Sequence, residues 1–363
     1  MRPIIDAHLD LAWNAMYFNR DLIRSVAEVR AAERDLTDEL SRGRSTTTFP
    51  ELRRANVAVC LATLMGRSGP DQPKRNGFRR VDLDYDNQVI AYSHTKGQLA
   101  YYRLLESLGQ LRFISSRRQL IAHWGEWMRA PTATPLGVIL SMEGADSIVN
   151  PEQTEAWWND GLRVVGPVHY GRSRYAHGTS TDGPLSEAGV KLLREFMRLG
   201  MILDVTHLSD QSFAHALDVY EGPLLASHHN CRALVPGDRQ LSDEQIKILI
   251  ERKAVIGAAF DDWMLYPGWK RGESKPEVVK IESVADHIDH ICQLAGDALH
   301  CALGTDLDGG FGTEQTPNDL DTYADVHKLE DILKRRGYSP ANIDGIFHGN
   351  WLRFLTEALP TDG

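Results

Sequence analysis

Short apolar runs rich in β-branched residues recur along this chain, and longer segments with a helical spacing of apolar positions separate them. Continuous apolar runs are typical of strands buried on both faces of a parallel sheet. No segment repeats literally, so the prediction depends on the alternation of the two patterns. This alternation predicts eight strands, at Ile4–His8, Val57–Leu64, Gly137–Glu143, Val164–His169, Ile202–His207, Leu224–His228, Val255–Phe260 and Ala302–Asp306.

Helical segments lie between these runs. Ser186–Leu199 carries Leu192, Leu193 and Phe196 on one side and stops at Gly200, a residue typical of helix ends. Ser242–Lys253 opens with a capping serine followed by two acidic residues, which suit the first turn of a helix. Similar patterns predict helices over Val278–Ala295, Asp319–Arg336 and Asn342–Leu359.

Strands that alternate with helices predict an α/β fold with a parallel sheet. Eight such units favour a closed (β/α)8 TIM barrel, formed as a single domain over residues 1–363. An open doubly wound sheet is the alternative, but no GxGxxG turn follows the first strand. Gly66–Arg80 reads as a surface loop. The long loop Asp261–Ser283 after strand seven, with its aromatic residues, is either a lid over a site or a solvated loop with its own small cluster.

The charge balance and the apolar runs argue against two classes of partner. The chain has 40 basic and 50 acidic residues, a net charge of −10, with no dense basic run, so we expect no nucleic-acid partner. The longest apolar runs are under ten residues, whereas a membrane span needs about 20, so we expect no membrane partner. The four cysteines are scattered without a CxxC pair, which predicts free thiols and a cytoplasmic location.

Histidine, aspartate or glutamate follows the apolar run of six of the eight predicted strands. Taken singly, each has another explanation: a strand-end histidine can be a hydrogen-bonded structural group, and Glu143 before Gly144 or Asp306 before Gly309 can belong to a turn. Their coincidence favours one shared metal site, because the carboxyl ends of barrel strands converge on one face. The residues are His8, Asp10, Glu143, His169, His207, His228 and Asp306.

Imidazole and carboxylate groups suit zinc and similar divalent ions. Residues two apart on a strand point to the same side, so His8 and Asp10 can reach one ion. The set contains more ligands than one tetrahedral ion requires. This surplus predicts two metal ions with one carboxylate bridging them.

The chain resembles the membrane (renal) dipeptidase family, the M19 metallopeptidases of the amidohydrolase superfamily. The similarity runs through nearly the whole sequence, and no single segment carries it. Strand three offers Glu143 and no lysine, which favours this branch over relatives with a carboxylated lysine. The motifs are IDAHLDLAW, SMEGADSI, VHYG, LDVTHLSD, LLASHHNCRAL with GDRQLSD, VADHIDHICQLAG, LGTDLDGG and GNWLRFL.

The resemblance implies the role of each residue. His8 and Asp10 would bind the more buried zinc ion, and His207 and His228 the second. Glu143 would bridge both ions, and Asp306 would stand beside the first metal and shuttle the proton. Asp308 is the nearest competitor for the role of Asp306. His229 is a rival to His228, and strand alternation would turn it away from the pocket if the strand continues to that point. His169 would polarise the scissile carbonyl, and Arg239 would hold the substrate's C-terminal carboxylate.

The resemblance thus implies a zinc-dependent dipeptidase that uses a hydroxide bridging two zinc ions and tolerates a D-residue at the C-terminal position. It also implies a homodimer. The family's mammalian members are secreted and lipid-anchored, whereas this chain shows neither a leader nor an anchor signal. Two alternatives stay open: another amidohydrolase, such as an N-acyl-amino-acid hydrolase or lactonase, and a non-catalytic metal-binding barrel.

Overall fold

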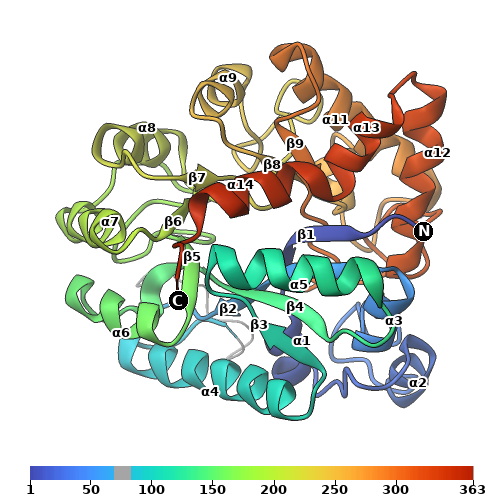
Figure 1. Ribbon diagram of the computed structural model, residues 1–363, viewed down its shortest axis with the longest axis horizontal. Coiled ribbons are helices and arrows are strands. Elements are labelled where there is room, and N and C mark those ends of the chain that lie inside the picture. Colours follow the sequence, from blue (N-terminus) through green and yellow to red (C-terminus); the bar gives the residue numbers. More distant parts are fainter. Residues whose placement is uncertain (69–82, 363) are drawn as a thin grey trace.

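The structure is a computed structural model and describes residues 1–68 and 83–362. Its strands form one nine-stranded sheet around which the helices are arranged (Figure 1). The strands are β1 (Ile4–Leu9), β2 (Val57–Met65), β3 (Leu111–Phe113), β4 (Leu136–Glu143), β5 (Leu162–Gly166), β6 (Ile202–Asp204), β7 (Leu224–Leu225), β8 (Ile256–Ala258) and β9 (Cys301–Leu303).

Eight strands form a nearly closed parallel barrel. They follow one another in the order β7-β6-β5-β4-β2-β1-β9-β8, and every neighbouring pair is parallel. Ala226, directly after β7, makes a parallel bridge to Ile256 of β8. Its N–H donates to the carbonyl of Val255 at 3.1 Å, and its own carbonyl accepts from Gly257 at 2.8 Å. This bridge joins the two ends of the series, so the predicted (β/α)8 barrel is confirmed.

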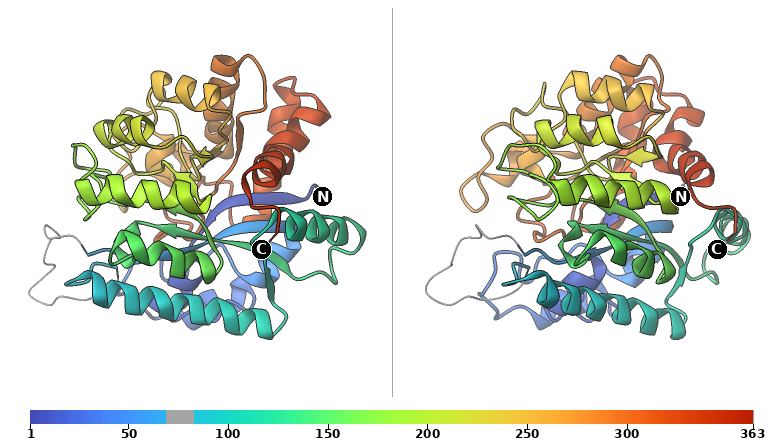
Figure 2. Two further views of the ribbon diagram at one scale, coloured as in Figure 1. Left: turned by 60° about the vertical axis from the view of Figure 1, so that its left-hand side comes forward. Right: turned by 90° about the vertical axis from the view of Figure 1, so that its left-hand side faces the viewer.

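Helices surround the barrel (Figure 2). They are α1 (Leu11–Tyr17), α2 (Val26–Ala32), α3 (Phe49–Arg54), α4 (Gln88–Ser107), α5 (Arg117–Arg129), α6 (Thr154–Asn159), α7 (Glu187–Leu199), α8 (Asp210–Val219), α9 (Asp243–Glu251), α10 (Asp262–Leu265), α11 (Ile281–Ala295), α12 (Lys328–Arg335), α13 (Pro340–Asp344) and α14 (Asn350–Ala358).

The predicted helices are present with adjusted ends. The side chain of Ser186 caps α7 by accepting from the N–H of Gly189, and Gly200 ends the helix with a φ of 76°. Ser242 caps α9 in a reciprocal capping box. The segment predicted as Asp319–Arg336 begins later, with the 3-10 turn Tyr323–His327 before α12. The segment predicted as Asn342–Leu359 contains the π-helical turn Gly345–Gly349 between α13 and α14.

Five predicted strands end earlier than expected, and in four of them the chain leaves the hydrogen-bonded ladder before the polar residue is reached. Pro167 has no N–H to donate, and β5 stops just before it, at Gly166. His207 and Asp306 have φ values of 68° and 59°, which do not belong to strands. The polar residues beyond β5, β6, β7 and β9 therefore lie in the loops that follow these strands.

The inside of the barrel is apolar and closed at one end. One hydrophobic cluster takes a side chain from seven of the eight ring strands and from the residue directly before β8: Ile5, Val59, Ile139, Val164, Ile202, Leu225, Val255 and Ala302. The same cluster includes Trp351 and Phe354 of α14 and Trp127 of α5. The indole N–H of Trp351 donates to the carbonyl of Leu303 at 2.7 Å. Helices α5 and α14 thus close the end where the strands begin, and the opposite end is left for a site.

Two glycines let the chain pass closely where the ring closes. A Cβ on Gly257 would lie 2.0 Å from the carbonyl oxygen of Ser227, and one on Gly304 would lie 1.8 Å from the same oxygen. No side chain fits at these distances, so both positions require glycine. The close approach fixes the backbone immediately before His228.

The segment after β8 is folded. It contains α10 and the 3-10 turn Pro276–Val278, and Trp269 is buried. Of the predicted surface loop Gly66–Arg80, residues 69–80 lie outside the described residues.

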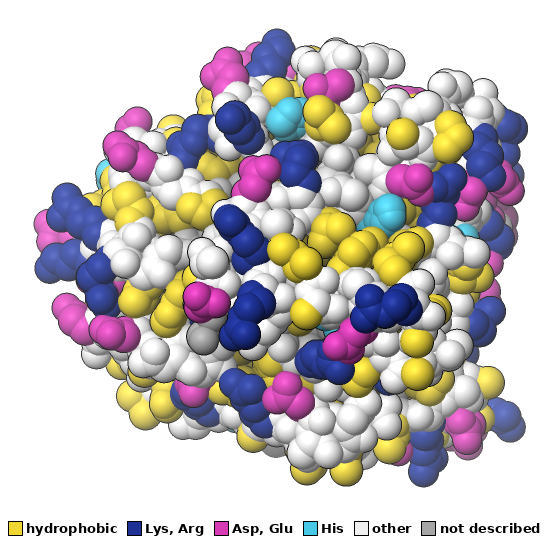
Figure 3. Space-filling model, in the orientation of Figure 1, with side chains coloured by type: hydrophobic (Ala, Val, Ile, Leu, Met, Phe, Trp, Pro, Cys, Tyr) yellow, Lys and Arg dark blue, Asp and Glu magenta, His cyan; other side chains and the backbone are white. Residues whose placement is uncertain are grey.

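Two surface properties bear on the expected partners. Within the described chain, no helix is both long and apolar enough to cross a membrane. On the face shown in Figure 3, lysine and arginine side chains are interspersed with aspartate and glutamate. The four cysteines are free thiols, as the sequence predicts.

Candidate metal centre

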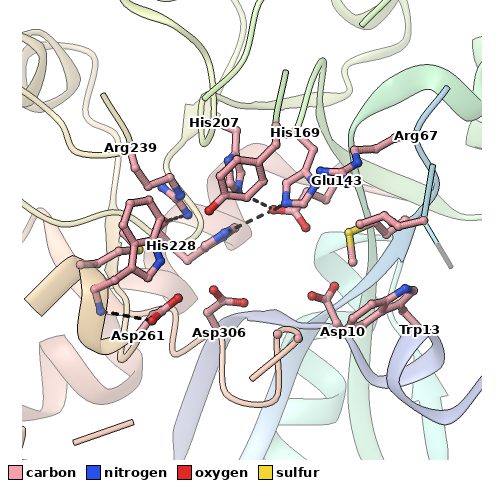
Figure 4. A pocket seen from close by; sticks show the side chains of 17 residues that line it. Asp10, Trp13, Arg67, Glu143, His169, His207, His228, Arg239, Asp261 and Asp306 are labelled. Atoms are coloured by element: carbon pink, nitrogen blue, oxygen red, sulfur yellow. Dashed lines mark hydrogen bonds and ion pairs between the residues drawn. The ribbon is translucent and has the colours of Figure 1, made fainter. Parts of the chain in front are cut away.

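A cavity of about 380 Å³ opens at the end of the barrel where the strands finish. Asp10 caps the start of α1, directly after β1, and Glu143 is the last residue of β4. His207, His228 and Asp306 follow β6, β7 and β9 in the loops. In Figure 4, the aspartates of the pocket lie along one side, and the arginines and most imidazoles lie along the other.

The predicted metal ligands come together as three overlapping groups, within each of which the ligand atoms lie within 4.8 Å of one another. The first group contains His8 with Asp10 and Glu143, and the second contains Glu143 with His207 and His228. The third contains His8, His228 and Asp306. Neighbouring groups share a member, so the geometry provides adjoining positions rather than one isolated site.

Glu143 lies at the centre of this arrangement. Its Oε1 is 3.0 Å from His207 Nε2 and 3.3 Å from His228 Nε2, while its Oε2 is 3.6 Å from His8 Nε2. The two oxygens of one carboxylate therefore face different histidines. A carboxylate in this position can bind two ions at once.

Several buried ligand atoms lack hydrogen-bond partners. Three of these atoms are shielded from solvent and have no hydrogen-bond partner among the described residues: His8 Nε2, Asp10 Oδ1 and Glu143 Oε1. Buried polar atoms are seldom left without a partner, since desolvation without compensation costs free energy. Nitrogen and oxygen donors of these types fit a divalent ion such as zinc.

Neighbouring hydroxyl groups orient the imidazoles. The Nδ1 atom of His207 lies 2.9 Å from Thr179 Oγ1, and that of His228 lies 2.9 Å from Ser227 Oγ. Each contact occupies the Nδ1 side of the ring and leaves Nε2 facing the cluster. Such contacts around metal ligands fix the ring orientation and tautomer.

Two buried aspartates on the strands hold the loops that carry ligands. Asp6 on β1 accepts hydrogen bonds from the N–H of His8 and of Thr305, each at 3.0 Å. Asp204 on β6 accepts from the N–H of Thr206 and of Ser227, each at 3.0 Å. Each carboxylate links the end of its own strand to a neighbouring loop. Our sequence reasoning missed both residues because they lie within the apolar runs.

Burial and neighbouring charges shift the pKa values of the residues in the cluster. Burial alone would lower the pKa of His8, but the carboxylates of Glu143, Asp10 and Asp306 outweigh it and raise the pKa to about 10. Burial raises the pKa of Glu143 to about 7 and holds that of Asp306 well above its ordinary value. Burial, followed by the charge of Arg239, lowers the pKa of His207.

Metal binding to the metal-free protein should therefore release protons. At pH 7 the metal-free chain carries a proton on His8 and a partial one on Glu143, and a bound ion must displace both. Because both pKa values are raised, apparent zinc affinity should rise with pH up to about 10, and most steeply below about 7, where Glu143 is protonated as well as His8. Calorimetry in buffers of different ionisation enthalpy should show about one proton or more released per chain. A pH-independent affinity without proton release would contradict this protonation pattern.

The structure also separates the predicted residues from their rivals. Arg239 is buried in the cavity wall; its Nη2 donates to the carbonyl of His228 at 3.0 Å. Asp308 faces away, since its carboxylate accepts from the N–H of Thr46 at 2.7 Å and from the hydroxyl of Ser45 at 2.7 Å. His229 belongs to none of the three ligand groups found among the described residues. Asp306 and His228 belong to the ligand groups, whereas Asp308 and His229 do not belong to any group found among the described residues.

His169 lies beside the cluster in the cavity wall. Its Nε2 is 3.7 Å from Glu143 Oε1, and its ring packs edge-on against that of His207, with centroids 4.4 Å apart. Burial, followed by the charge of Arg67, lowers the pKa of His169 well below its ordinary value. The lowered pKa favours the neutral imidazole, in which one ring nitrogen donates a hydrogen bond and the other accepts one.

Other cavity residues were not predicted from the sequence. Arg67, Tyr170 and Asp261 line the pocket, as do Trp13 and Trp263. Arg67 follows β2 at the same end of the barrel, so its position after a strand was a usable signal. The predicted site contained only acids and histidines at the strand ends, and Arg67 belonged to a predicted surface loop. Trp263 lies in the segment after β8, so this segment forms part of the pocket wall.

The sequence model described as membrane dipeptidase, peptidase family M19, matches residues 1–361. The chain belongs to the membrane dipeptidase family. It is therefore a metallo-dipeptidase of peptidase family M19, as its resemblance implied. The buried ligand groups described above are what a metallopeptidase requires.

A curated dipeptidase and two solved structures are similar to this chain over nearly its whole length. Dipeptidase verJ of Clonostachys rogersoniana is 27% identical over 368 residues, which cover 97% of this chain and 83% of that protein. The crystal structure of dipeptidase AC, a metallo peptidase of family M19, has a TM-score of 0.76 at 22% identity and covers 99% of both chains. A metallo peptidase from Rhodobacter sphaeroides, crystallised with a phosphinate mimic of L-Ala-D-Ala, has a TM-score of 0.77 at 21% identity with 99% coverage of both chains. At such identities the structural likeness establishes the shared fold.

Proposed function

We propose that this M19 enzyme is a zinc-dependent dipeptidase with two metal ions, which hydrolyses dipeptides and accepts a D-residue at the C-terminal position. The observation that carries the proposal is the placement of Glu143, whose two carboxylate oxygens face His8 on one side and His207 with His228 on the other. A single ion would not need ligands on both sides of this carboxylate.

In this proposal, His8 and Asp10 would hold one ion, and His207 and His228 would hold the other. Glu143 would serve both ions, and Asp306 would stand beside the first. When bound, zinc supplies a water molecule of lowered pKa and polarises the substrate carbonyl. The protein contributes fixed ligands, a closed apolar base beneath them and the groups that bind the dipeptide.

Arg239 binds the C-terminal carboxylate of the dipeptide in this account. Guanidinium groups match carboxylates in charge and shape, and Nη1 of Arg239 has no hydrogen-bond partner among the described residues. The cavity of about 380 Å³ is small, and anchoring the carboxylate limits how much chain can extend past the metal cluster. We therefore expect dipeptides rather than longer peptides as substrates.

His169 and Asp306 act on the reacting groups. The Nε2 side of His169 faces the cluster, where it can donate a hydrogen bond to the carbonyl oxygen as negative charge develops on it. Burial raises the pKa of Asp306, which suits a group that accepts a proton from the attacking water and returns it to the leaving amine.

A substrate panel tests the proposal. The zinc-loaded enzyme should cleave L-Xaa-D-Xaa dipeptides and lose this activity on chelation, with zinc restoring it. N-acyl amino acids and lactones, screened at the same concentration, should react far more slowly. Efficient turnover of either class without dipeptide hydrolysis would contradict the proposal, as would a metal-loaded protein that turns over none of these compounds.

The predictions of a single domain over residues 1–363, a homodimer and a cytoplasmic location stay predictions. Sedimentation of the purified chain would test the second of them directly.

A further inference from the structure

Arg67 enters the pocket from the end of β2 and is held there on two sides. Its backbone N–H donates to the carbonyl of Leu83, and its carbonyl accepts from the N–H of Tyr85, both at 2.8 Å. Its Nε and Nη2 atoms donate to the two carboxylate oxygens of Asp84 at 2.6 and 2.7 Å. This bidentate pairing sets the plane and direction of the guanidinium.

The remaining terminal nitrogen of Arg67 faces His169. Nη1 lies 3.2 Å from His169 Nδ1, and Figure 4 shows the arginine reaching the pocket beside this ring. A guanidinium carries only donors, so Nδ1 must be the acceptor of this hydrogen bond. An Nδ1 that accepts cannot carry a proton. The proton of a neutral His169 must therefore be on Nε2.

Nε2 is the nitrogen that faces the metal cluster. Its distance of 3.7 Å to Glu143 Oε1 is too long for a hydrogen bond, so its N–H is available to another acceptor. We infer that Arg67, held by Asp84, is a positioning residue that fixes His169 in its neutral Nε2–H form and points this donor at the substrate carbonyl. The inference rests on the proposed function for the identity of that acceptor.

An ion pair between Arg67 and Asp84 could also serve only to fold the chain. Two features argue for more than that. Arg67 lines the cavity, with its side chain only 14% exposed, and the pairing with Asp84 leaves one terminal nitrogen directed at an imidazole. Nη1 of Arg67 thus contacts His169, which has a proposed part in the reaction.

The first test observes the tautomer in the holoenzyme and needs no change at Arg67. Nitrogen-15 spectra of zinc-loaded protein labelled in its histidines distinguish protonated from unprotonated ring nitrogens, and the spectrum of His169→Gln identifies the signals of this residue. We expect a protonated Nε2 and an unprotonated Nδ1. A protonated Nδ1 in the wild-type enzyme would overturn the inference.

The second test measures turnover of an L-Xaa-D-Xaa dipeptide. Arg67→Met should lower kcat by about 10- to 100-fold with little change in KM, a typical cost of removing a group that orients a neighbour of a metal site. Arg67→Lys, which keeps a cationic donor, should recover part of kcat. The kcat of Asp84→Asn should lie between that of Arg67→Met and that of the wild type. Arg172→Met makes the same chemical change at an exposed nearby position and should retain wild-type kcat.

These outcomes separate the inference from the proposed function. Wild-type kcat in Arg67→Met, or equal loss in Arg67→Met and Arg172→Met, would overturn the positioning role while dipeptide hydrolysis by the parent enzyme stands. If Arg67→Met does not fold, the wild-type spectrum and Asp84→Asn still decide. A parent enzyme that cleaves no dipeptide would contradict the proposed function, whereas the tautomer would remain measurable.

Discussion

Asp306→Asn should lower kcat for dipeptide hydrolysis by about 10²- to 10⁴-fold, the contribution of a positioned general acid–base group. Asparagine preserves the size of the side chain but cannot accept and return a proton. Burial raises the pKa of Asp306 well above its ordinary value, so this carboxylate holds a proton more readily than an exposed aspartate does. Turnover should be measured together with the metal content of the purified variant, which should stay close to that of the parent.

Asp308→Asn is the matched control, because the two aspartates are two positions apart and share an unusual backbone, with φ values of 59° and 65°. The carboxylate of Asp308 accepts from the N–H groups of Thr46 and Thr47 rather than facing the pocket. Its substitution should therefore reduce thermal stability more than kcat. Near-normal turnover by Asp306→Asn would remove its proposed role, and the reverse ranking of the two variants would assign that role to Asp308.

Arg239→Met should reduce kcat/KM for dipeptides with a free carboxylate by roughly 10²- to 10³-fold. Truncating one partner of a buried, charged hydrogen-bonded pair costs about 2–5 kcal/mol, which corresponds to a loss of this order. The effect should fall mainly on KM, because the anchor holds the substrate at a distance from the reacting bond. Arg232→Met, which removes a guanidinium paired with Asp210 near the surface, is the control and should change kcat/KM little.

The parent enzyme offers an independent check on Arg239. Dipeptides amidated at the C-terminus lack the charge that Arg239 would bind, so they should be poor substrates. Arg239→Met should discriminate between the amidated and the free dipeptide far less than the parent does. Equal cleavage of both forms by the parent enzyme would show that the anchor is elsewhere.

The barrel was predictable because its sequence signal is regular. Each of the eight ring strands contributes a buried apolar run, and one cluster inside the ring takes a side chain from each of these runs. The additional strand β3 was missed, since its three residues, Leu111–Phe113, give too short a pattern and pair only with β4. Strand ends were overestimated where an apolar run continues past the last ladder pair. Pro167 was a visible signal for one such end, whereas the positive φ of His207 was not.

The gathering of the candidate metal ligands in one pocket was predictable for a different reason. A barrel gathers the ends of its strands, so the type and position of a residue in the sequence suffice to place His8, Glu143 and His228 in one pocket. Groups that act by holding others carry no such signal. Asp6 and Asp204 lie within strands, and the contact of Arg67 with His169 depends on side-chain directions that spacing alone does not reveal.

The proposed function requires two divalent ions that share Glu143. The most direct measurement is anomalous diffraction at the zinc absorption edge from crystals of the zinc-loaded enzyme. We expect two peaks, one beside His8 and Asp10 and one beside His207 and His228, with Glu143 between them. A single peak, or none within this cluster while the enzyme cleaves dipeptides, would contradict the account.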